Sequence, residues 1–515
     1  MFDEREKKYS RILLTASWIL IIAWRLYFLF RYSFNYVDED SAITWIGTVH
    51  FAHGHLANPF YLGQDYNIML DALLAAPLYL LGWPLNYALP FTTFILCLFP
   101  FVFCSVFAWR GGKRGAAFVP VLLMAAAGWK WDLFTSIPRT LISGFGVAVV
   151  GAVICNDTGA KTAKMFTGAF LCVLGAVMTL SAVTVSGLAF LGYFLSLPAE
   201  GEPAEKKKRT AALFGGIILG ILVYAAGRVY FYLHPEEMLR SGSLEGMHFD
   251  TFLENLRNLP GILSDLFSGG AVIVPLILAG LTVLAIFCKR YRELVLLLAA
   301  AGGSMATLSF GWTEIYDRGG LMFGQVRIFL YVVFVALTVS ALSESVLPEK
   351  WEKGFVCAAL PVIILLIAYK AFAFNTELGR EDTELLPPGA GITIMSVEAL
   401  EKQADAMVQT AQEYGIDVLI CIDYSRVFEH GASALYYDSP VVFYVPDRER
   451  RTWVWKEMNE KTGQDILFYT LPVSKDMQVT YVNTGDMTVP TYLEKELGIT
   501  RGLDKIWGIR GGELE

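Results

Sequence analysis

The chain has 515 residues, of which 55% are hydrophobic and only 17% are charged, and its formal net charge is −8. Soluble globular proteins carry about 25% charged residues. This composition excludes a disordered chain, a small disulfide-rich scaffold and a nucleic-acid-binding domain. Residues 377–515 hold 24 acidic and 13 basic residues, a net charge of −11, which leaves +3 for the preceding residues. The sequence therefore predicts a polytopic membrane domain, residues 1–375, followed by a soluble domain, residues 376–515.

Apolar segments of about 17–25 residues can span a bilayer, and eleven segments are candidates for such helices. Clusters of Lys and Arg fall between alternate segments, beginning with Arg5, Lys7 and Lys8. Because cytoplasmic loops are enriched in basic residues, we expect the N-terminus inside the cell and the acidic tail outside, with the plasma membrane between them. The eleven segments are residues 12–30, 88–109, 117–131, 140–155, 165–180, 183–197, 211–232, 271–288, 294–310, 328–341 and 354–374.

Residues 67–83 are also apolar, but they contain Asp71 and end at Gly82-Trp83-Pro84. If this segment crossed the membrane, every later basic loop would change sides. We therefore expect a juxtamembrane helix that lies along the outer surface, within an outer loop of residues 32–88.

The tail combines short β-rich runs with helical patterns, which favours a small α/β domain. Ser396 is placed to cap a helix whose apolar face recurs at helical spacing. Strands are expected at residues 392–395, 418–422, 441–445 and 466–469, and a further helix at 452–460. The expected apolar face consists of Val397, Leu400, Ala404, Met407, Val408 and Ala411.

Asp38, Glu39 and Asp40 follow the first apolar segment directly. Three acidic residues at a membrane boundary are costly without a role or a partner. One carboxylate could act as a general base toward a hydroxyl group, or the triplet could bind a divalent cation. The alternative is a solvated loop in which Asp40 caps the next helix.

Further polar residues lie in the same outer loop. His50, His53 and His55 could hold a metal ion, although such histidines more often form a hydrogen-bonding surface at the level of the lipid headgroups. Gln64 and Asp65 could contact a sugar or orient a base, or Asp65 could simply cap the surface helix.

Arginines are scarce on the expected outer side, where Arg139, Arg318 and Arg327 occur. The planar guanidinium group suits phosphate, because it donates two parallel charge-assisted hydrogen bonds. The alternative is that these side chains extend to the lipid headgroups. Arg25, within the first apolar segment, is the weaker candidate for a phosphate contact.

The arrangement resembles the GT-C superfamily of membrane glycosyltransferases, and most closely the branch of the protein O-mannosyltransferases and the aminoarabinose transferase (glycosyltransferase family 39-like). An inner N-terminus, one span and an Asp-Glu pair at its outer end carry the resemblance. Here Asp38-Glu39 precedes the apolar run 42–47, and residues 67–82 match the family's juxtamembrane helix. Arg139 lies in the second outer loop, and Arg327 opens a late span, at positions where the family often carries arginine. The family's Pro-Pro is absent before the juxtamembrane helix, and residues 63–66 replace it.

The resemblance implies a polytopic α-helical membrane protein that transfers a sugar from a polyprenyl-phosphate donor to an acceptor hydroxyl on a glycan, lipid or protein. It implies inversion at the anomeric carbon, with Asp38 as general base and Glu39 or Asp40 orienting it or the acceptor. Arg139 and Arg327 would hold the departing phosphate. No cofactor is required, although a divalent cation could still bind the acidic triplet.

Two other functions remain open at this point. A transporter or flippase for a lipid-linked glycan would place polar residues near the middle of the membrane and often shows repeated halves. The candidate spans are poor in charge and the polar residues gather in outer loops, which favours an enzyme. A non-catalytic cell-envelope assembly protein would not need Asp38.

Overall fold

The structure is a computed structural model. It describes residues 4–54, 68–136, 141–157, 161–179, 182–196, 203–233, 249–267, 279–307 without 281, 284 and 288, 349–378, 394–413, 418–422, 426–439, 441–446, 467–468, 479–483, 506–510 and 513–514.

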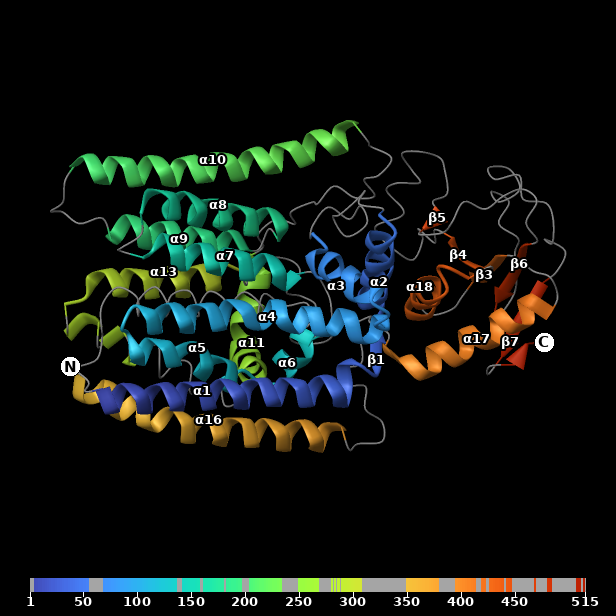
Figure 1. The fold of residues 1–515 in the computed structure, drawn as a ribbon, viewed down its shortest axis with the longest axis horizontal. Coiled ribbons are helices and arrows are strands. Elements are labelled where there is room, and N and C mark those ends of the chain that lie inside the picture. The colour runs from blue at the N-terminus through green and yellow to red at the C-terminus, as the bar shows by residue number, and fades with distance from the viewer. Residues whose placement is uncertain are drawn as a thin grey trace.

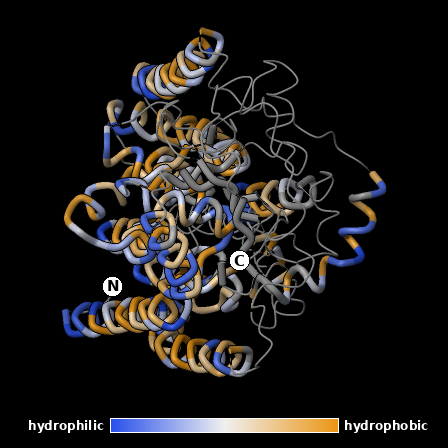
Figure 2. Tube along the Cα trace, turned by 90° about the vertical axis from the view of Figure 1, so that its right-hand side faces the viewer, coloured by the Kyte–Doolittle hydropathy of each residue, from blue (hydrophilic) through white to orange (hydrophobic). Residues whose placement is uncertain are grey.

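Long apolar helices run side by side and form most of the molecule (Figure 1). Within the described residues, four helices are long and apolar enough to cross a membrane. They are α1 (Glu4–Phe28), which continues into a π-helical turn, η1 (Leu29–Ser33), and α4 (Leu85–Arg110), α10 (Pro203–Leu233) and α16 (Glu349–Leu378). Hydrophobic residues cover most turns of the described helices (Figure 2), as expected of segments that contact lipid.

Shorter apolar helices correspond to several of the other expected spans. They are α5 (Arg114–Ala126), α7 (Leu141–Cys155), α8 (Thr162–Met178), α9 (Val183–Ser196) and α13 (Tyr291–Thr307). The expected span 117–131 is wrong as a single helix, because α5 ends at Ala126 and a separate helix, α6 (Trp129–Ser136), follows. The expected span 328–341 and most of 271–288 lie outside the described residues.

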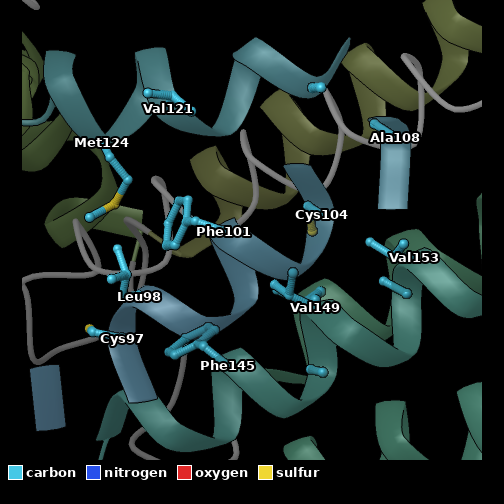
Figure 3. Packing of buried hydrophobic residues seen from close by; sticks show 14 of the residues in the cluster. Cys97, Leu98, Phe101, Cys104, Ala108, Val121, Met124, Phe145, Val149 and Val153 are labelled. Carbon is cyan, nitrogen blue, oxygen red and sulfur yellow. The ribbon is translucent and has the colours of Figure 1, made fainter. Parts of the chain in front are cut away.

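Side chains of α4 form a buried layer between α5 and α7. Phe101 is directed toward Met124 of α5, while Phe145 of α7 lies beside Cys97 and Leu98 (Figure 3). These residues belong to the largest hydrophobic cluster of the described structure, which joins α1, α4, α5, α7, α8 and α9.

Glycines allow α7, α8 and α10 to approach one another closely. A Cβ atom at Gly175 of α8 would lie 2.5 Å from the carbonyl oxygen of Gly144 in α7, and one at Gly216 of α10 would clash with the carbonyl oxygen of Phe166 in α8. Small residues at such contacts are characteristic of helix packing in membranes, where van der Waals contact replaces the hydrophobic effect.

At one end of the bundle the chain forms β1 (Tyr36–Asp38), α2 (Glu39–Ala52) and α3 (Leu70–Leu80). The helix α2 runs across the direction of the long helices (Figure 1). A Cβ atom at Gly47 of α2 would lie 2.8 Å from the sulfur of Met69, which immediately precedes α3, so these two helices are closely packed. Helix α3 falls within the segment expected to be the juxtamembrane helix, and its Leu73, Leu74 and Leu80 side chains are exposed.

The C-terminal residues form a sheet with two described helices. The elements are β2 (Ile394–Ser396), α17 (Val397–Glu413), β3 (Val418–Ile422), α18 (Arg426–Leu435), β4 (Val442–Pro446), β5 (Leu467–Phe468), β6 (Val479–Asn483), β7 (Ile506–Arg510) and β8 (Glu513–Leu514). Six described strands form one sheet in the order β5-β4-β3-β6-β7-β8. The four central strands are parallel, and each edge strand is antiparallel to its neighbour.

The expected apolar face of α17 is buried at all six positions, and the Ser396 hydroxyl accepts a hydrogen bond from the Ala399 amide at 3.2 Å. The expected strand 418–422 has the bounds of β3. Strands β6, β7 and β8 were not predicted, and the expected helix 452–460 lies outside the described residues.

Candidate functional site

Asp38 is the last residue of β1 and the N-cap of α2. Its Oδ1 atom accepts a hydrogen bond from the Ser41 amide at 2.7 Å, and its backbone is extended. The residue is only 1% exposed. Asp38 therefore presents a carboxylate whose position is fixed by the start of a helix.

The expectation that Asp40 caps this helix was wrong by two residues. Glu39 and Asp40 form the first turn of α2 and are half-buried. Acidic residues are favourable there, because the amide groups at a helix N-terminus carry partial positive charge. The acidic triplet is thus not a solvated loop. Asp38 is buried and caps the helix, and Glu39 and Asp40 follow, half-buried, in its first turn.

The strand that carries Asp38 pairs with the start of the C-terminal segment. β1 and β2 are antiparallel, with Asp38 opposite Ile394 and Tyr36 opposite Ser396. The pairing extends by one hydrogen bond, from the Val397 amide to the Asn35 carbonyl at 2.9 Å. The C-terminal segment therefore packs directly beside the candidate base.

Helix α18 lies against α2, in an apolar cluster that includes Trp45, Ile46, Val427 and Phe428. At the edge of this contact, the His53 ring nitrogen Nε2 lies 2.9 Å from Asp438 Oδ1. Both His50 and His53 contact the ring of Tyr437, with centroids 5.6 and 4.8 Å apart.

Of the two roles considered for His50 and His53, these contacts agree with a hydrogen-bonding surface, here between α2 and the residues that follow α18. Burial and then the Asp438 carboxylate raise the pKa of Tyr437 above its ordinary value. Among the described residues no group of three or more His, Cys, Asp and Glu side chains is placed to hold a metal ion. His55 lies outside the described residues.

A second buried carboxylate, Asp71, was not singled out as a site residue. It lies in the first turn of α3 and is 2% exposed, and the Thr93 hydroxyl of α4 lies 3.5 Å from its Oδ2 atom. The signal was present in the sequence, because an acidic residue inside an apolar helix is costly unless it has a partner or a role.

The other candidate site residues lie outside the described residues. They are Gln64, Asp65, Arg139, Arg318 and Arg327. Arg139 follows the end of α6 by three positions.

Arg25 neither extends to the headgroups nor faces solvent. Its Nη1 atom lies 2.8 Å from Asp132 Oδ1, and Lys370 Nζ lies 3.0 Å from Asp132 Oδ2. All three side chains are at most 2% exposed. Arg25 and Lys370 lie within expected spans, so the expectation of charge-poor spans was wrong at this point. The sequence did not reveal the pairing, because it joins residues from three separate helices.

No family model matches the chain, and no curated protein matches it. Among solved structures, the chain is similar to ArnT from Cupriavidus metallidurans, determined by crystallography in the apo state. The similarity covers 95% of this chain and 85% of that chain, with 14% sequence identity and a TM-score of 0.45.

Proposed function

We propose that the protein is an integral membrane glycosyltransferase of the GT-C type. It transfers a sugar from a polyprenyl-phosphate donor to an acceptor hydroxyl group, at the outer face of the plasma membrane. The observation that carries this proposal is the buried carboxylate of Asp38, fixed at the start of α2 beside the paired strands β1 and β2.

Asp38 acts as the general base. The acceptor oxygen attacks the anomeric carbon from the face opposite the phosphate, its proton passes to the Asp38 carboxylate, and the bond between that carbon and the phosphate oxygen breaks with inversion. Glu39 and Asp40 lie next along the chain, where they orient the acceptor. Gln64 and Asp65 contribute sugar contacts from the same outer loop.

The leaving group is the polyprenyl phosphate, which needs charge compensation rather than a general acid. Arg139 and Arg327 supply that compensation through bidentate guanidinium contacts, and Arg318, nine residues before Arg327, is a further cation. No step requires a cofactor. If a divalent cation binds at Glu39 and Asp40 and takes part in the reaction, a chelator should abolish sugar transfer.

The proposal includes a topology in the plasma membrane. The N-terminus is cytoplasmic, the long helices cross the bilayer, and residues 376–515 form an extracytoplasmic domain. The acceptor reaches Asp38 from the outer aqueous side, while the donor enters from the lipid.

A transporter for a lipid-linked glycan is the second candidate, and one observation favours it. Arg25, Asp132 and Lys370 place charge inside the bundle, where transporters bind ions or substrates. Both oxygens of Asp132 already have protein donors, which favours a structural use of this charge over transport.

The test is Asp38→Asn, which the structure makes unusually clean. Asparagine is as good an N-cap as aspartate, so the variant should keep the start of α2 and lose only the basicity. Loss of a positioned general base costs on the order of 10²–10⁴ in rate, so we expect transfer at least a hundredfold slower with donor binding retained. The assay is sugar transfer from a radiolabelled polyprenyl-phosphate sugar by the purified protein in lipid.

Asp40→Asn is the matched control, because Asp40 lies in the same turn without capping the helix. We expect this variant to lose less activity than Asp38→Asn. Normal transfer by both variants would reject Asp38 as the general base, whereas absence of transfer by the wild-type protein would reject the enzyme and leave the transporter as the better candidate.

A further inference from the structure

A break interrupts the helical path between α5 and α6. Ala127, between the two helices, forms an isolated bridge with Phe267, which directly follows α11 (Phe249–Leu266). Inside a lipid-embedded bundle, the carbonyl groups freed by such a break must find donors within the protein.

Two buried cations supply those donors. Lys370 of α16 donates to the Met124 carbonyl at 2.9 Å, in the last turn of α5. Arg25 of α1 donates to the Asp132 and Thr135 carbonyls at 3.2 and 3.4 Å, near the end of α6. The carbonyl ends of helices carry partial negative charge, so each cation stabilises a helix terminus as well as a hydrogen bond.

One carboxylate joins both cations. Asp132 Oδ1 accepts from Arg25 at 2.8 Å, and its Oδ2 accepts from Lys370 at 3.0 Å and from the Trp24 indole nitrogen at 2.6 Å. This buried charge cluster (Trp24, Arg25, Asp132 and Lys370) therefore ties α1, α6 and α16 together.

Aromatic packing continues from the charge cluster to the strand of Asp38. Trp24 lies edge-on to Phe374 of α16, with centroids 6.1 Å apart, and Phe28 packs on the same ring at 4.7 Å. Trp129 and Ile394 pack against this aromatic group. Ile394 is the register partner of Asp38.

Each helix held by the charge cluster leads to a part of the proposed site. α1 leads through η1 to β1 and Asp38, α6 leads to the segment with Arg139, and α16 precedes β2. We propose that Asp132 is a positioning residue: held by Trp24, Arg25 and Lys370, it fixes the ends of α1, α6 and α16 and so sets the position of the general base Asp38 at the end of this bundle. This inference rests on the proposed glycosyl transfer.

Trp24→Phe tests the proposal with a small change. An aromatic ring still packs on Phe374, while the hydrogen bond from the indole nitrogen to Asp132 is lost. Trp18→Phe is the matched control, because Trp18 lies in the same helix and donates its indole hydrogen to Ser105 Oγ of α4 at 3.0 Å, outside the charge cluster. Asp132→Asn is avoided, since it would leave two buried cations without their carboxylate.

We expect kcat per folded molecule to fall at least tenfold in Trp24→Phe and less than twofold in Trp18→Phe, because small misplacements of reacting groups are costly. Hydrogen exchange, followed by mass spectrometry, should increase in the peptide containing Trp129–Ser136 for Trp24→Phe and not for Trp18→Phe. Lys370→Met, which leaves a neutral Arg25–Asp132 pair, should behave like Trp24→Phe and replaces it if that variant does not fold.

Equal kcat in Trp24→Phe and Trp18→Phe overturns the proposal, as does unchanged exchange of α6 in both Trp24→Phe and Lys370→Met. Failure of the general-base assignment is distinguished by Asp38→Asn, which would then transfer sugar at the wild-type rate. If the wild-type protein transfers no sugar, the role of Asp132 in setting the reaction geometry is rejected along with that activity.

Discussion

At the start of α2, one carboxylate is used as a helix cap and is also the candidate base. A cap normally needs only a side-chain oxygen, which serine, threonine or asparagine would provide equally well. Asp38 is buried, and among the residues that commonly cap helices only aspartate has a carboxylate. Fixing Oδ1 on the Ser41 amide also fixes the orientation of the whole carboxylate, which favours proton transfer along one direction.

The donor side of the proposed site is also tested at the residue scale. If Arg139 and Arg327 hold the phosphate, Arg→Lys at either position should weaken donor binding, because a point charge replaces a bidentate fork. A charge-assisted contact contributes about 1.5–3 kcal/mol, which corresponds to roughly a ten- to hundredfold loss of affinity.

Equilibrium binding of a fluorescent polyprenyl phosphate measures this effect. Arg110→Lys is the control, since Arg110 is exposed at the end of α4, remote in sequence from both arginines. Unchanged affinity in both Arg139→Lys and Arg327→Lys would assign these residues to headgroup contacts.

Between elements, the packing of α7, α8 and α10 depends on glycine. Added Cβ atoms would meet backbone atoms of the neighbouring helix at Gly175, where Gly144 O and Ala148 N lie 2.5 and 2.6 Å away. Backbone atoms of a helix cannot move away from an added methyl group as a flexible side chain can. The two helices themselves would therefore have to separate.

Gly175→Ala should therefore destabilise the protein by about 1–3 kcal/mol, the usual cost of overpacking. Gly187→Ala in α9 is the control, because nothing lies within 4 Å of its Cβ position. Alanine is the better helix former, by up to about 1 kcal/mol, so this variant should be neutral or slightly stabilised. Thermal unfolding in one detergent compares the two, and equal midpoints would contradict the close packing.

Local patterns predicted local structure well, and contacts across the chain poorly. Helical spacing identified the buried face of α17, and a serine directly before that helix identified the cap, because both depend on neighbours within a few turns. The pairing of β1 with β2 and of Arg25 with Asp132 joins residues that no local pattern connects. Gly128 carried a signal for the break after α5, since an isolated glycine weakens a helix. The acidic triplet was found, but its cap was misplaced because three neighbouring carboxylates are equivalent in sequence.

Over the whole molecule, charge and structure divide the chain at the same region. The basic, apolar part of the chain forms the helical bundle, and the described residues of the acidic part after 377 form the sheet, α17 and α18. At the N-terminal end of α1, which is the end far from Asp38, Lys353 pairs with Glu6 at 2.9 Å, and Glu352 accepts a hydrogen bond from the Gly115 amide at 2.8 Å. The beginnings of α1, α5 and α16 therefore meet at one end of the bundle, where basic residues are concentrated.

If that end is cytoplasmic, reporters should separate cleanly. Alkaline phosphatase fused after residue 379 should be active, and the same enzyme fused at residue 200, between α9 and α10, should be inactive. Green fluorescent protein at the same two positions is the complementary control and should fluoresce only at residue 200. Activity of one reporter at both positions would reject the proposed topology.

The pairing of β1 with β2 joins segments about 360 residues apart, a contact that forms late in folding. During synthesis the Asp38 strand leaves the ribosome long before its partner exists. Its edge then stays unpaired while the intervening helices and the first strand of the tail are synthesised. The packing around the candidate base is therefore completed only when the chain has been made past Ser396, which ties maturation of the site to nearly complete biogenesis of the protein.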